Sequence, residues 1–191
     1  MEKVVGITGT IASGKDTVKK ILQSKFNCYT VSLSSIIKAE LEKKKNKNFS
    51  RKNLQDLGNE LRKKYGTHIL AMLAVEYLQR DKELIIIDGI RNPGEVDFLR
   101  KKFGNKFVLI GVDANPKIRF ERIKKRGNDS DPKTWEEFLE IDKRDQGENE
   151  PEYGQKTKEC LEKADFLIIN DSTLEDLEKK VNEIAEKIKN W

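Results

Sequence analysis

Residues 9–17 have the sequence Gly-Thr-Ile-Ala-Ser-Gly-Lys-Asp-Thr, in which Gly9, Gly14 and Lys15 match the phosphate-binding pattern G-x-x-x-x-G-K. Glycines at these places let backbone amides approach phosphate oxygens without a Cβ in the way. A lysine ammonium neutralises the outer phosphates, and a helix beginning near Lys15 points its positive end at the same anion. The segment predicts a site for a nucleoside triphosphate. Its candidate residues are Gly9, Thr10, Ala12, Ser13, Gly14, Lys15, Asp16 and Thr17.

The position after the lysine departs from the pattern, which usually has Ser or Thr there with its hydroxyl on Mg²⁺. Here it is Asp16, and Thr17 follows. Asp16 could bind Mg²⁺ directly as a hard oxygen ligand, or Thr17 or water could take that role. A carboxylate beside a triphosphate repels it unless a cation lies between them. We therefore expect nucleotide binding to depend unusually strongly on Mg²⁺.

A second acidic position follows the apolar run at residues 84–87. Asp88, at the end of a predicted buried strand, fits the carboxylate that positions Mg²⁺ or its waters beside a phosphate loop. Gly89 would allow a ligand to approach closely, and Arg91 offers a planar fork suited to a phosphate monoester. These residues predict the acceptor side of a phosphoryl-transfer site.

Three of the nine arginines lie close together in one predicted helix, namely Arg119, Arg122 and Arg126. Spacings of three and four residues place them on one helical face. There they can compensate the charge of a polyphosphate during transfer. Arg144 could close onto the same phosphates if the polar loop after Arg126 is a hinged lid, and Arg62 could reach an acceptor phosphate.

The elements that must position these side chains alternate between short apolar runs and longer amphipathic stretches, which is typical of βα units around a parallel sheet. Strands are predicted at 3–8, 28–33, 83–88, 106–113 and 165–170. Helices are predicted at 15–25, 35–45, 52–64, 67–79 and 115–126, and after the start signals Asn92–Pro93–Glu95, Thr134–Glu137 and Ser172–Glu175. The last helix has an apolar face formed by Leu174, Leu177, Val181, Ile184, Ala185 and Ile188.

The length of 191 residues predicts a single domain spanning residues 1–191. Residues 34–79 are too long for a single crossover between strands, so we expect a helical insertion there that binds the acceptor. Residues 127–133 form the predicted lid loop. The lone histidine, His68, has no evident partner and is interpreted as structural.

Composition excludes several classes of protein. No apolar run approaches the roughly 18 residues that span a bilayer, and the first residues lack a signal core, so we expect a cytoplasmic protein without membrane contact. Two cysteines, Cys28 and Cys160, predict neither a disulfide framework nor a zinc site. The net charge of +5 is uneven, with +9 in residues 1–64 and −9 in residues 127–191. No aromatic residues interleave the lysines at 43–47, which we interpret as a solvated helix end, so nucleic acid is not expected as a partner.

With these residues in hand, the chain resembles the P-loop nucleoside monophosphate kinases. GTIASGKDT is similar to the adenylate kinase loop, where the residue after lysine is also not serine and a threonine follows. IIDGIR resembles that family's Asp-Gly-x-x-Arg segment, with the arginine one position nearer. DGIRNPGEVDFLRKKFG, RFERIKKRGNDSDPKTWEEFLEIDKRD and ADFLIINDSTLEDL resemble a group of uncharacterised, adenylate-kinase-related proteins common in archaea.

The resemblance covers almost the whole chain. It implies a three-layer α/β fold with five parallel strands in the order 2-3-1-4-5, a helical acceptor-binding insertion and a lid. It also implies ATP as donor, Mg²⁺ as cofactor and a small phosphorylated acceptor. In that scheme Lys15 and the loop amides hold ATP. Asp16, Thr17 and Asp88 bind the metal, and Gly89 and Arg91, with Arg62, bind the acceptor. The helical arginines Arg119, Arg122 and Arg126 act on the transferring group, and Arg144 belongs to the lid.

Two related kinase families are competing interpretations. Dephospho-coenzyme A kinases usually place an aspartate just after strand two, whereas residues 28–35, CYTVSLSS, hold no carboxylate. The GKD form of the loop and the stretch LQDLGNELRKKYG at 54–66 are more similar to deoxynucleoside monophosphate kinases. The sequence does not disclose the acceptor base or the oligomeric state.

A different class of function is a non-catalytic, nucleotide-dependent switch that binds RNA or protein through the basic first third. A GTPase is disfavoured because no N-K-x-D segment occurs: Asn105 and Lys106 are followed by Phe107 and Val108. The H-x-E and P-C-x-x-C pair of cytidine-type deaminases is also missing. Formation of a phosphorylated acceptor would favour the enzyme, whereas saturable RNA binding without such a product would favour the switch.

Overall fold

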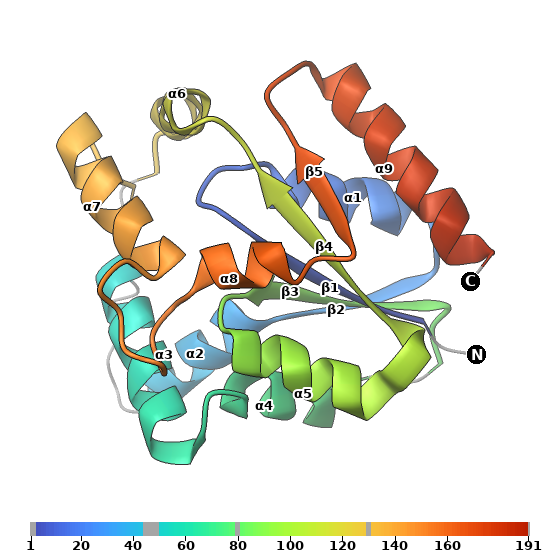
Figure 1. The fold of residues 1–191 in the computed structure, drawn as a ribbon, viewed down its shortest axis with the longest axis horizontal. Coiled ribbons are helices and arrows are strands. Elements are labelled where there is room, and N and C mark those ends of the chain that lie inside the picture. Colours follow the sequence, from blue (N-terminus) through green and yellow to red (C-terminus); the bar gives the residue numbers. More distant parts are fainter. Residues whose placement is uncertain (1–2, 44–49, 79–80, 129–130, 191) are drawn as a thin grey trace.

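The computed structural model describes residues 3–43, 50–78, 81–128 and 131–190. Its centre is a sheet of five parallel strands in the order β2-β3-β1-β4-β5, twisted across the middle of the molecule (Figure 1). The strands are β1 (Lys3–Gly9), β2 (Cys28–Ser32), β3 (Leu84–Ile90), β4 (Phe107–Asp113) and β5 (Phe166–Ile169). This confirms the predicted fold class and strand order.

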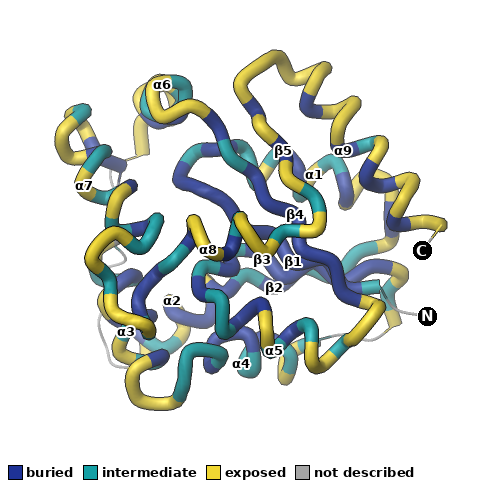
Figure 2. The backbone as a smooth tube through the Cα atoms, in the orientation of Figure 1, coloured by how far each residue is buried: buried dark blue, intermediate teal, exposed yellow. Residues whose placement is uncertain are grey.

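Helices connect the strands and cover both faces of the sheet (Figure 1). They are α1 (Lys15–Lys25), α2 (Leu33–Lys43), α3 (Arg51–Tyr65), α4 (Ile69–Glu76), α5 (Pro93–Phe103), α6 (Pro116–Arg126), α7 (Trp135–Gln146), α8 (Thr157–Glu162) and α9 (Leu174–Lys189), with a short 3₁₀ turn η1 (Gly104–Lys106). Figure 2 shows the central strands as largely buried and the outer sides of the helices as exposed.

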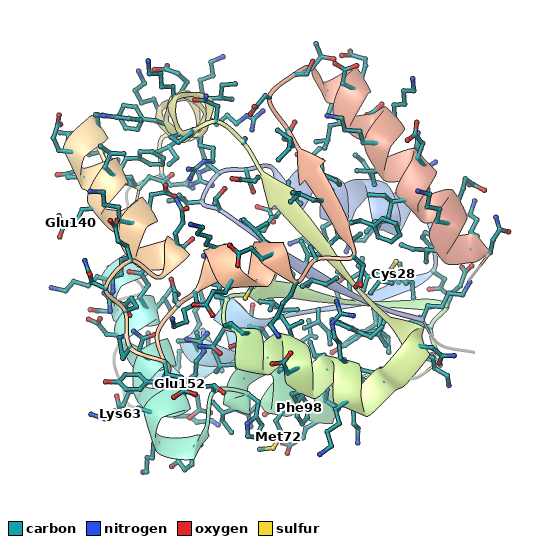
Figure 3. All side chains as sticks on the ribbon, in the orientation of Figure 1. Cys28, Lys63, Met72, Phe98, Glu140 and Glu152 are labelled. Carbon is teal, nitrogen blue, oxygen red and sulfur yellow. The ribbon has the colours of Figure 1, made fainter. Side chains whose placement is uncertain are left out.

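Two apolar layers enclose the sheet because alternate side chains of a strand point to opposite faces. In β1, Val5 and Ile7 join the layer under α1 and α9, whereas Val4 joins the layer under α2, α4 and α5. Met72 of α4 and Phe98 of α5, labelled in Figure 3, pack against the latter layer. Burial on both faces explains the continuous apolar sequences of the central strands.

A third, smaller cluster holds α6 and α7 beside the loop that follows β1. Its buried members are Ile11, Ile123 and Phe138. The rings of Phe120, Trp135 and Phe138 contact one another at centroid distances of 5.2 to 5.5 Å. Aromatic packing of this kind fixes α7 over the phosphate loop, so the residues of α7 face the same region as the loop.

Strand β3 continues beyond the predicted end at Asp88. Ile7 of β1 pairs with Asp88, but its neighbour Thr8 pairs with Ile90, so Gly89 is the extra residue of a bulge. Gly89 has φ of 84°, a conformation that glycine adopts without steric cost. Asp88 therefore remains within β3, paired with Ile7 of β1 on one side and Ser32 of β2 on the other.

Two of the predicted helix starts are confirmed by complete capping boxes. At α5 the Asn92 side chain accepts a hydrogen bond from Gly94 N–H, and Glu95 accepts from the backbone N–H of Asn92. At α7 Thr134 and Glu137 exchange the equivalent bonds. Both boxes satisfy N–H groups that a helix leaves unpaired at its start.

The predicted start of the last helix is wrong by one residue. Its N-cap is Thr173, whose Oγ1 accepts from the N–H of Asp176, while Ser172 lies outside the cap and bonds the Asp176 carboxylate. The shift places Leu174 at the exposed first position, 55% accessible, although the predicted face counts it as core. The other five apolar residues of that face are buried as predicted.

The predicted helical insertion corresponds to α2, α3 and α4. Helix α2 begins two residues earlier than predicted, at Leu33, and is described to Lys43. Helix α4 is shorter than predicted: it runs from Ile69, after Gly66 with φ of 100°, to Glu76. The remaining lysines of the basic run and residue 79 lie outside the described residues. Lys43 itself forms an ion pair with Glu40 on the solvent side.

Three further expectations can be compared with the structure. Cys28 and Cys160 are both free, in agreement with the absence of a disulfide framework. His68 stacks on Phe98 with ring centroids 5.5 Å apart, away from the site described below. Within the described ranges, no helix combines the length and apolar character that crossing a membrane requires.

Candidate active site

The loop at the carboxyl end of β1 is held in a conformation that its glycines permit. A Cβ on Gly9 would lie 2.0 Å from the carbonyl oxygen of Val112, and a Cβ on Gly14 would lie 2.4 Å from Nδ2 of Asn170. Gly14 also has φ of 103°. Ala12 adopts φ of 58°, which costs a residue with a side chain about 1–2 kcal/mol. Such strain is typical of backbone that a ligand site requires.

Neighbouring elements fix this loop from behind. Thr10 Oγ1 donates to Asp113 at 2.6 Å, and Asn170 Nδ2 donates to the carbonyl of Ser13 at 2.8 Å. Both Thr10 and Ser13 are buried. Together with Gly9 they are the predicted ATP-binding residues that do not line the pocket.

Lys15 opens α1 and folds back over the loop. Its Nζ donates to the carbonyls of Gly9 at 2.8 Å and Thr10 at 2.6 Å. No side chain caps α1, whose N-cap is Gly14. The positive end of the helix dipole therefore faces the pocket beside the lysine ammonium, an arrangement suited to an anion.

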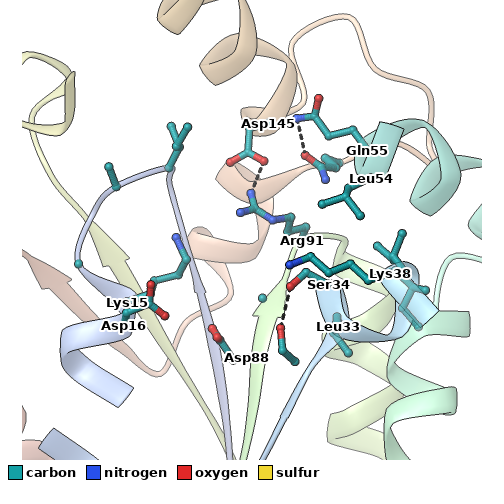
Figure 4. Close-up of a pocket in the computed structure, with 18 of the residues that line it drawn as sticks. Lys15, Asp16, Leu33, Ser34, Lys38, Leu54, Gln55, Asp88, Arg91 and Asp145 are labelled. Carbon is teal, nitrogen blue, oxygen red and sulfur yellow. Dashed lines mark hydrogen bonds and ion pairs between the residues drawn. The ribbon is translucent and has the colours of Figure 1, made fainter. Parts of the chain in front are cut away.

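A pocket of about 490 Å³ extends from this loop to α2, α3 and α7 (Figure 4). Figure 4 shows Lys15 and Asp16 on one side, Lys38 and Leu54 on the other, and Asp88 between them. The lining residues are Ile11, Ala12, Gly14, Lys15, Asp16, Thr17, Ser32, Leu33, Ser34, Ile37, Lys38, Leu54, Gln55, Arg62, Leu70, Asp88, Gly89, Arg91, Arg122, Arg126, Asp145 and Gln155. The pocket thus has a phosphate-loop half and a second half.

The two predicted metal-binding carboxylates meet at one lysine that sequence reasoning missed. Lys19 Nζ lies 2.8 Å from Asp16 Oδ1 and 2.8 Å from Asp88 Oδ2. The hydrogen bond from Lys19 lowers the pKa of Asp16, outweighing the opposing effect of burial. Burial acts to lower the pKa of Lys19, but its bonds to both carboxylates outweigh that effect and raise the pKa above 10.5. Asp16 and Lys19 are therefore both held in their charged forms.

This arrangement fits a Mg²⁺ ion of the kind that nucleotides bring. Magnesium keeps several waters and binds proteins through one or two carboxylates plus substrate phosphates. Asp16 and Asp88 already share one cationic nitrogen, so they lie close enough to share a cation. Among the residues the structure describes, no larger cluster of three or more acidic, histidine or cysteine side chains offers an alternative metal site.

The second half of the pocket is built around Arg91, just after the β3 bulge. Its Nη1 forms an ion pair with Asp145 of α7 (Figure 4). Gly89 lies beside it, and a Cβ there would meet nothing within 4 Å, so the space in front of the bulge is open. Lys38 of α2 also lines this half and forms no ion pair with any residue described.

The three helical arginines do not share one face toward the pocket, since Arg122 and Arg126 line it and Arg119 does not. Arg119 is 2% exposed, pairs with Asp142 through both terminal nitrogens, and does not line the pocket. Arg126 lines the pocket but is held by Asp131 at 2.6 Å. Arg122 lines it and, among the described residues, donates hydrogen bonds to the carbonyls of Ser13 and Asn170.

Partial burial also affects the guanidinium of Arg122. Burial lowers the pKa of Arg122, against a smaller opposing effect of Asp171. A guanidinium that is partly desolvated and bonded to carbonyl oxygens retains its positive charge without a neutralising carboxylate in contact. Arg122 is therefore the helical arginine best suited to meet an anionic ligand.

Arg62 and Arg144, the predicted site arginines that lie neither in α6 nor just after β3, are both held by carboxylates. Arg62 lines the pocket but is 2% exposed and bonds Glu95, which also accepts from the backbone N–H of Arg91. Through Glu95 it supports the turn that presents Arg91, while its own side chain forms a buried part of the pocket lining. Arg144 does not line the pocket and binds Asp56 and Glu150, so it ties α7 to α3.

Among the charged and amide side chains that line the pocket, sequence reasoning missed Lys38, Gln55, Asp145 and Gln155. It also missed Lys19, which pairs with the lining residues Asp16 and Asp88. Lys19 follows Lys15 by four residues, so helical spacing could have placed it on the same face. No comparable signal marks the others. Gln55 Nε2 donates to Gln155 Oε1 at 3.1 Å across 100 residues of sequence, and only the fold brings them together.

Comparison with known proteins gives a consistent family. A model described as an AAA domain matches residues 5–152. A UPF0200 protein of Methanocaldococcus jannaschii is 32% identical over 190 residues, covering 98% of this chain and 91% of that protein. One from Pyrococcus horikoshii is 31% identical over 193 residues, covering 98% and 99%. These matches confirm the predicted relationship to archaeal P-loop proteins.

Solved structures share the fold. The protein TT1252 from Thermus thermophilus superimposes with a TM-score of 0.60 at 19% identity, covering 97% of each chain. A shikimate kinase from Bacteroides thetaiotaomicron superimposes with a TM-score of 0.56 at 15% identity, covering 98% of each chain. At this level of identity the likeness shows a P-loop kinase-like fold.

Proposed function

Since the chain belongs to the UPF0200 family and contains an AAA domain, we propose that it is an ATP- and Mg²⁺-dependent kinase of the cytoplasm. It transfers the γ-phosphoryl group of ATP to a nucleoside or deoxynucleoside monophosphate. One observation carries this proposal: a single pocket contains both the phosphate loop and a second, cation-bearing half, with Asp88 between them. A protein that only binds nucleotide needs the first half alone.

The donor half holds the triphosphate through the loop amides, the start of α1 and the Lys15 ammonium. Lys15 reaches the outer phosphates by leaving the carbonyls of Gly9 and Thr10, to which it is bonded without nucleotide. Asp16, Thr17 and Asp88 are the residues that would hold Mg²⁺, which when bound neutralises charge on the β- and γ-phosphates.

The acceptor half binds the monophosphate through Arg91 and Lys38. Arg91 is paired with Asp145 in this structure, and an incoming phosphate offers it two further oxygens. Lys38 lines the same half from α2 (Figure 4). Arg62 and Glu95 fix the backbone of Arg91, so they position the phosphate-binding side chain without touching the ligand.

Transfer requires alignment more than covalent chemistry. An oxygen of the acceptor phosphate attacks the γ-phosphorus while the bond to the β,γ-bridging oxygen breaks, giving ADP and a nucleoside diphosphate. The attacking oxygen is already anionic, so no general base is needed. Arg122, with Arg126 beside it, stabilises charge on the transferring group, and α7 excludes water from above.

A second candidate is a kinase acting on a hydroxyl acceptor, such as dephospho-coenzyme A. The observation in its favour is Asp145, a buried carboxylate from α7 that lines the acceptor half. Its Oδ2 has no hydrogen-bond partner among the described residues. A hydroxyl acceptor whose binding exposes that oxygen would supply the partner. It would transfer its proton to the carboxylate as its own oxygen attacks the γ-phosphorus and ADP leaves.

Product analysis tests these proposals directly. The protein is incubated with ATP, Mg²⁺ and a panel of ribo- and deoxynucleoside monophosphates plus dephospho-coenzyme A. A nucleoside diphosphate supports the first candidate, and coenzyme A supports the second. Slow ATP hydrolysis without any acceptor product, together with saturable RNA binding, would instead indicate the nucleotide-dependent switch.

Variants at the phosphate loop provide the internal control. Lys15→Ala should abolish transfer while leaving the thermal unfolding midpoint close to that of the parent, because Lys15 is half-buried and lines the pocket rather than the apolar core. Lys20→Ala, an exposed residue on the same helix, should leave both unchanged. Full activity of the Lys15→Ala variant would refute the proposed donor site.

A further inference from the structure

We propose that Lys19 is a positioning residue that acts as an internal cation at the metal site. In the nucleotide-free protein its ammonium bonds both Asp16 and Asp88 and weakens the binding of free divalent cations there. When a nucleoside triphosphate binds together with a divalent cation, that cation replaces the ammonium. The inference rests on the proposed function, because it assumes that ATP and Mg²⁺ bind at this loop.

The geometry places Lys19 where a cation is needed. It lies one helical turn after Lys15 on α1, and its ammonium bridges that helix to β3, 69 residues away in sequence. Both contacts measure 2.8 Å. The side chain of Asp88 is 12% exposed and that of Asp16 is 77% exposed. The inner contact is therefore shielded from solvent, and the outer contact is the one that solvent weakens.

The charges explain why a metal competes with the lysine. Two carboxylates and one ammonium leave a net charge of about −1, whereas the carboxylates alone carry about −2 and attract a divalent cation more strongly. A triphosphate adds several negative charges next to Lys15. With these charges present, the site binds the divalent ion in preference to the monovalent ammonium. The long, flexible stem of Lys19 lets its ammonium withdraw when this happens.

Lys19 thereby links metal binding to nucleotide binding. The nucleotide-free protein binds Mg²⁺ weakly, and the nucleotide-bound protein binds it strongly. By thermodynamic linkage, the metal strengthens nucleotide binding by the same factor. Removal of the ammonium should weaken this coupling because the site would then accept the metal alone.

Metal titration of the nucleotide-free protein measures the effect. Mn²⁺ binding is followed by electron paramagnetic resonance for the parent, Lys19→Met, Lys19→Gln, Lys19→Arg and Lys20→Met. We expect Lys19→Met and Lys19→Gln to bind Mn²⁺ about tenfold more tightly than the parent, an ordinary size for coupling between adjacent sites. Lys19→Arg retains the cation and should resemble the parent.

Lys20→Met is the matched control because it removes the same charge from the neighbouring, exposed position. It should bind Mn²⁺ as the parent does. A second readout is the thermal unfolding midpoint: without metal it should fall in Lys19→Met, where two carboxylates lose their shared counter-ion, and Mn²⁺ should restore it. If both neutral Lys19 variants bind Mn²⁺ no better than Lys20→Met, the role assigned to Lys19 is wrong.

Failure of this inference can be told apart from failure of the proposed function. Transfer of phosphate by the parent protein without a gain in Mn²⁺ affinity in the Lys19 variants would remove the inference and leave the function. Absence of ATP binding by the parent would remove the proposed function and, with it, the nucleotide-delivered metal on which the inference depends.

Discussion

Exchange of Arg119 for methionine tests whether this arginine acts in structure or in catalysis. The sequence places it on a face with Arg122 and Arg126, whereas the structure buries it against Asp142, at 2.5 and 2.8 Å, outside the pocket. Methionine retains an unbranched apolar stem of similar reach. The substitution therefore removes the charge and leaves Asp142 as a buried, uncompensated carboxylate.

The expected loss of stability follows from that burial. Breaking a buried ion pair by removing one partner costs about 3–5 kcal/mol. For a chain of this size each kcal/mol lowers the unfolding midpoint by roughly 2–4 °C, so the midpoint should fall by about 6–20 °C. A fully solvated arginine of a catalytic face would lower it hardly at all.

Calorimetry and steady-state kinetics, both at a temperature where the variant is folded, separate the two roles. We expect Arg119→Met to lose stability but to keep kcat within about tenfold of the parent, whereas removal of an arginine that contacts the transferring phosphoryl group costs about 10³ or more. The double variant Arg119→Met with Asp142→Asn should recover much of the stability. Asparagine removes the stranded charge and still accepts the hydrogen bond from Gln146.

If the unfolding midpoint of Arg119→Met lies within 1–2 °C of the parent's while kcat falls by three orders of magnitude, the main role of Arg119 is not its ion pair with Asp142. The original prediction of a catalytic arginine would then stand. If the double variant is no more stable than the single one, the cost does not come from the stranded carboxylate of Asp142.

Two further substitutions test the site. Gly14→Ala forces a Cβ to 2.4 Å from Asn170 Nδ2 at φ of 103°. The free energy of unfolding should therefore fall by about 2–4 kcal/mol, and ATP affinity should fall as well. The control is Gly104→Ala, which has φ of 57° and open space around the added Cβ; it measures the backbone contribution alone and should leave ATP affinity unchanged. Lys38→Met should raise the KM for the acceptor about tenfold or more and leave the KM for ATP unchanged, since a charge-assisted phosphate contact is worth roughly 1.5–3 kcal/mol. Lys43→Met, on the same helix and paired with Glu40, is its control, and equal effects of the two lysine variants on acceptor KM would contradict the assignment of Lys38.

Local signals account for the parts of the fold that sequence reasoning predicted well. The capping boxes at Asn92 and Thr134 begin α5 and α7 as expected, because a cap depends on residues within one turn. The last helix shows the limit of that logic. Ser172 and Thr173 are both good caps, and the structure uses Thr173, with Leu174 exposed at the first helical position.

The arginines show what a sequence pattern leaves open. Helical spacing shows that Arg119, Arg122 and Arg126 are neighbours, but it does not show which carboxylate approaches each of them. Asp142 lies 23 residues from Arg119 and comes to it only because aromatic packing joins α6 and α7. That contact turns a candidate catalytic group into part of the framework.

The sequence by itself determined the phosphate loop, since Gly9, Gly14 and Lys15 between a strand and a helix specify a local backbone shape and a local charge. Tertiary structure alone decided which other charges face that loop. Lys19 meets Asp88, Arg91 meets Asp145, and Arg119 turns away, in each case through contacts between residues far apart in the chain. The physical reason is range: backbone conformation depends on neighbours a few residues away, whereas the charge state and accessibility of a side chain depend on whatever the fold packs against it.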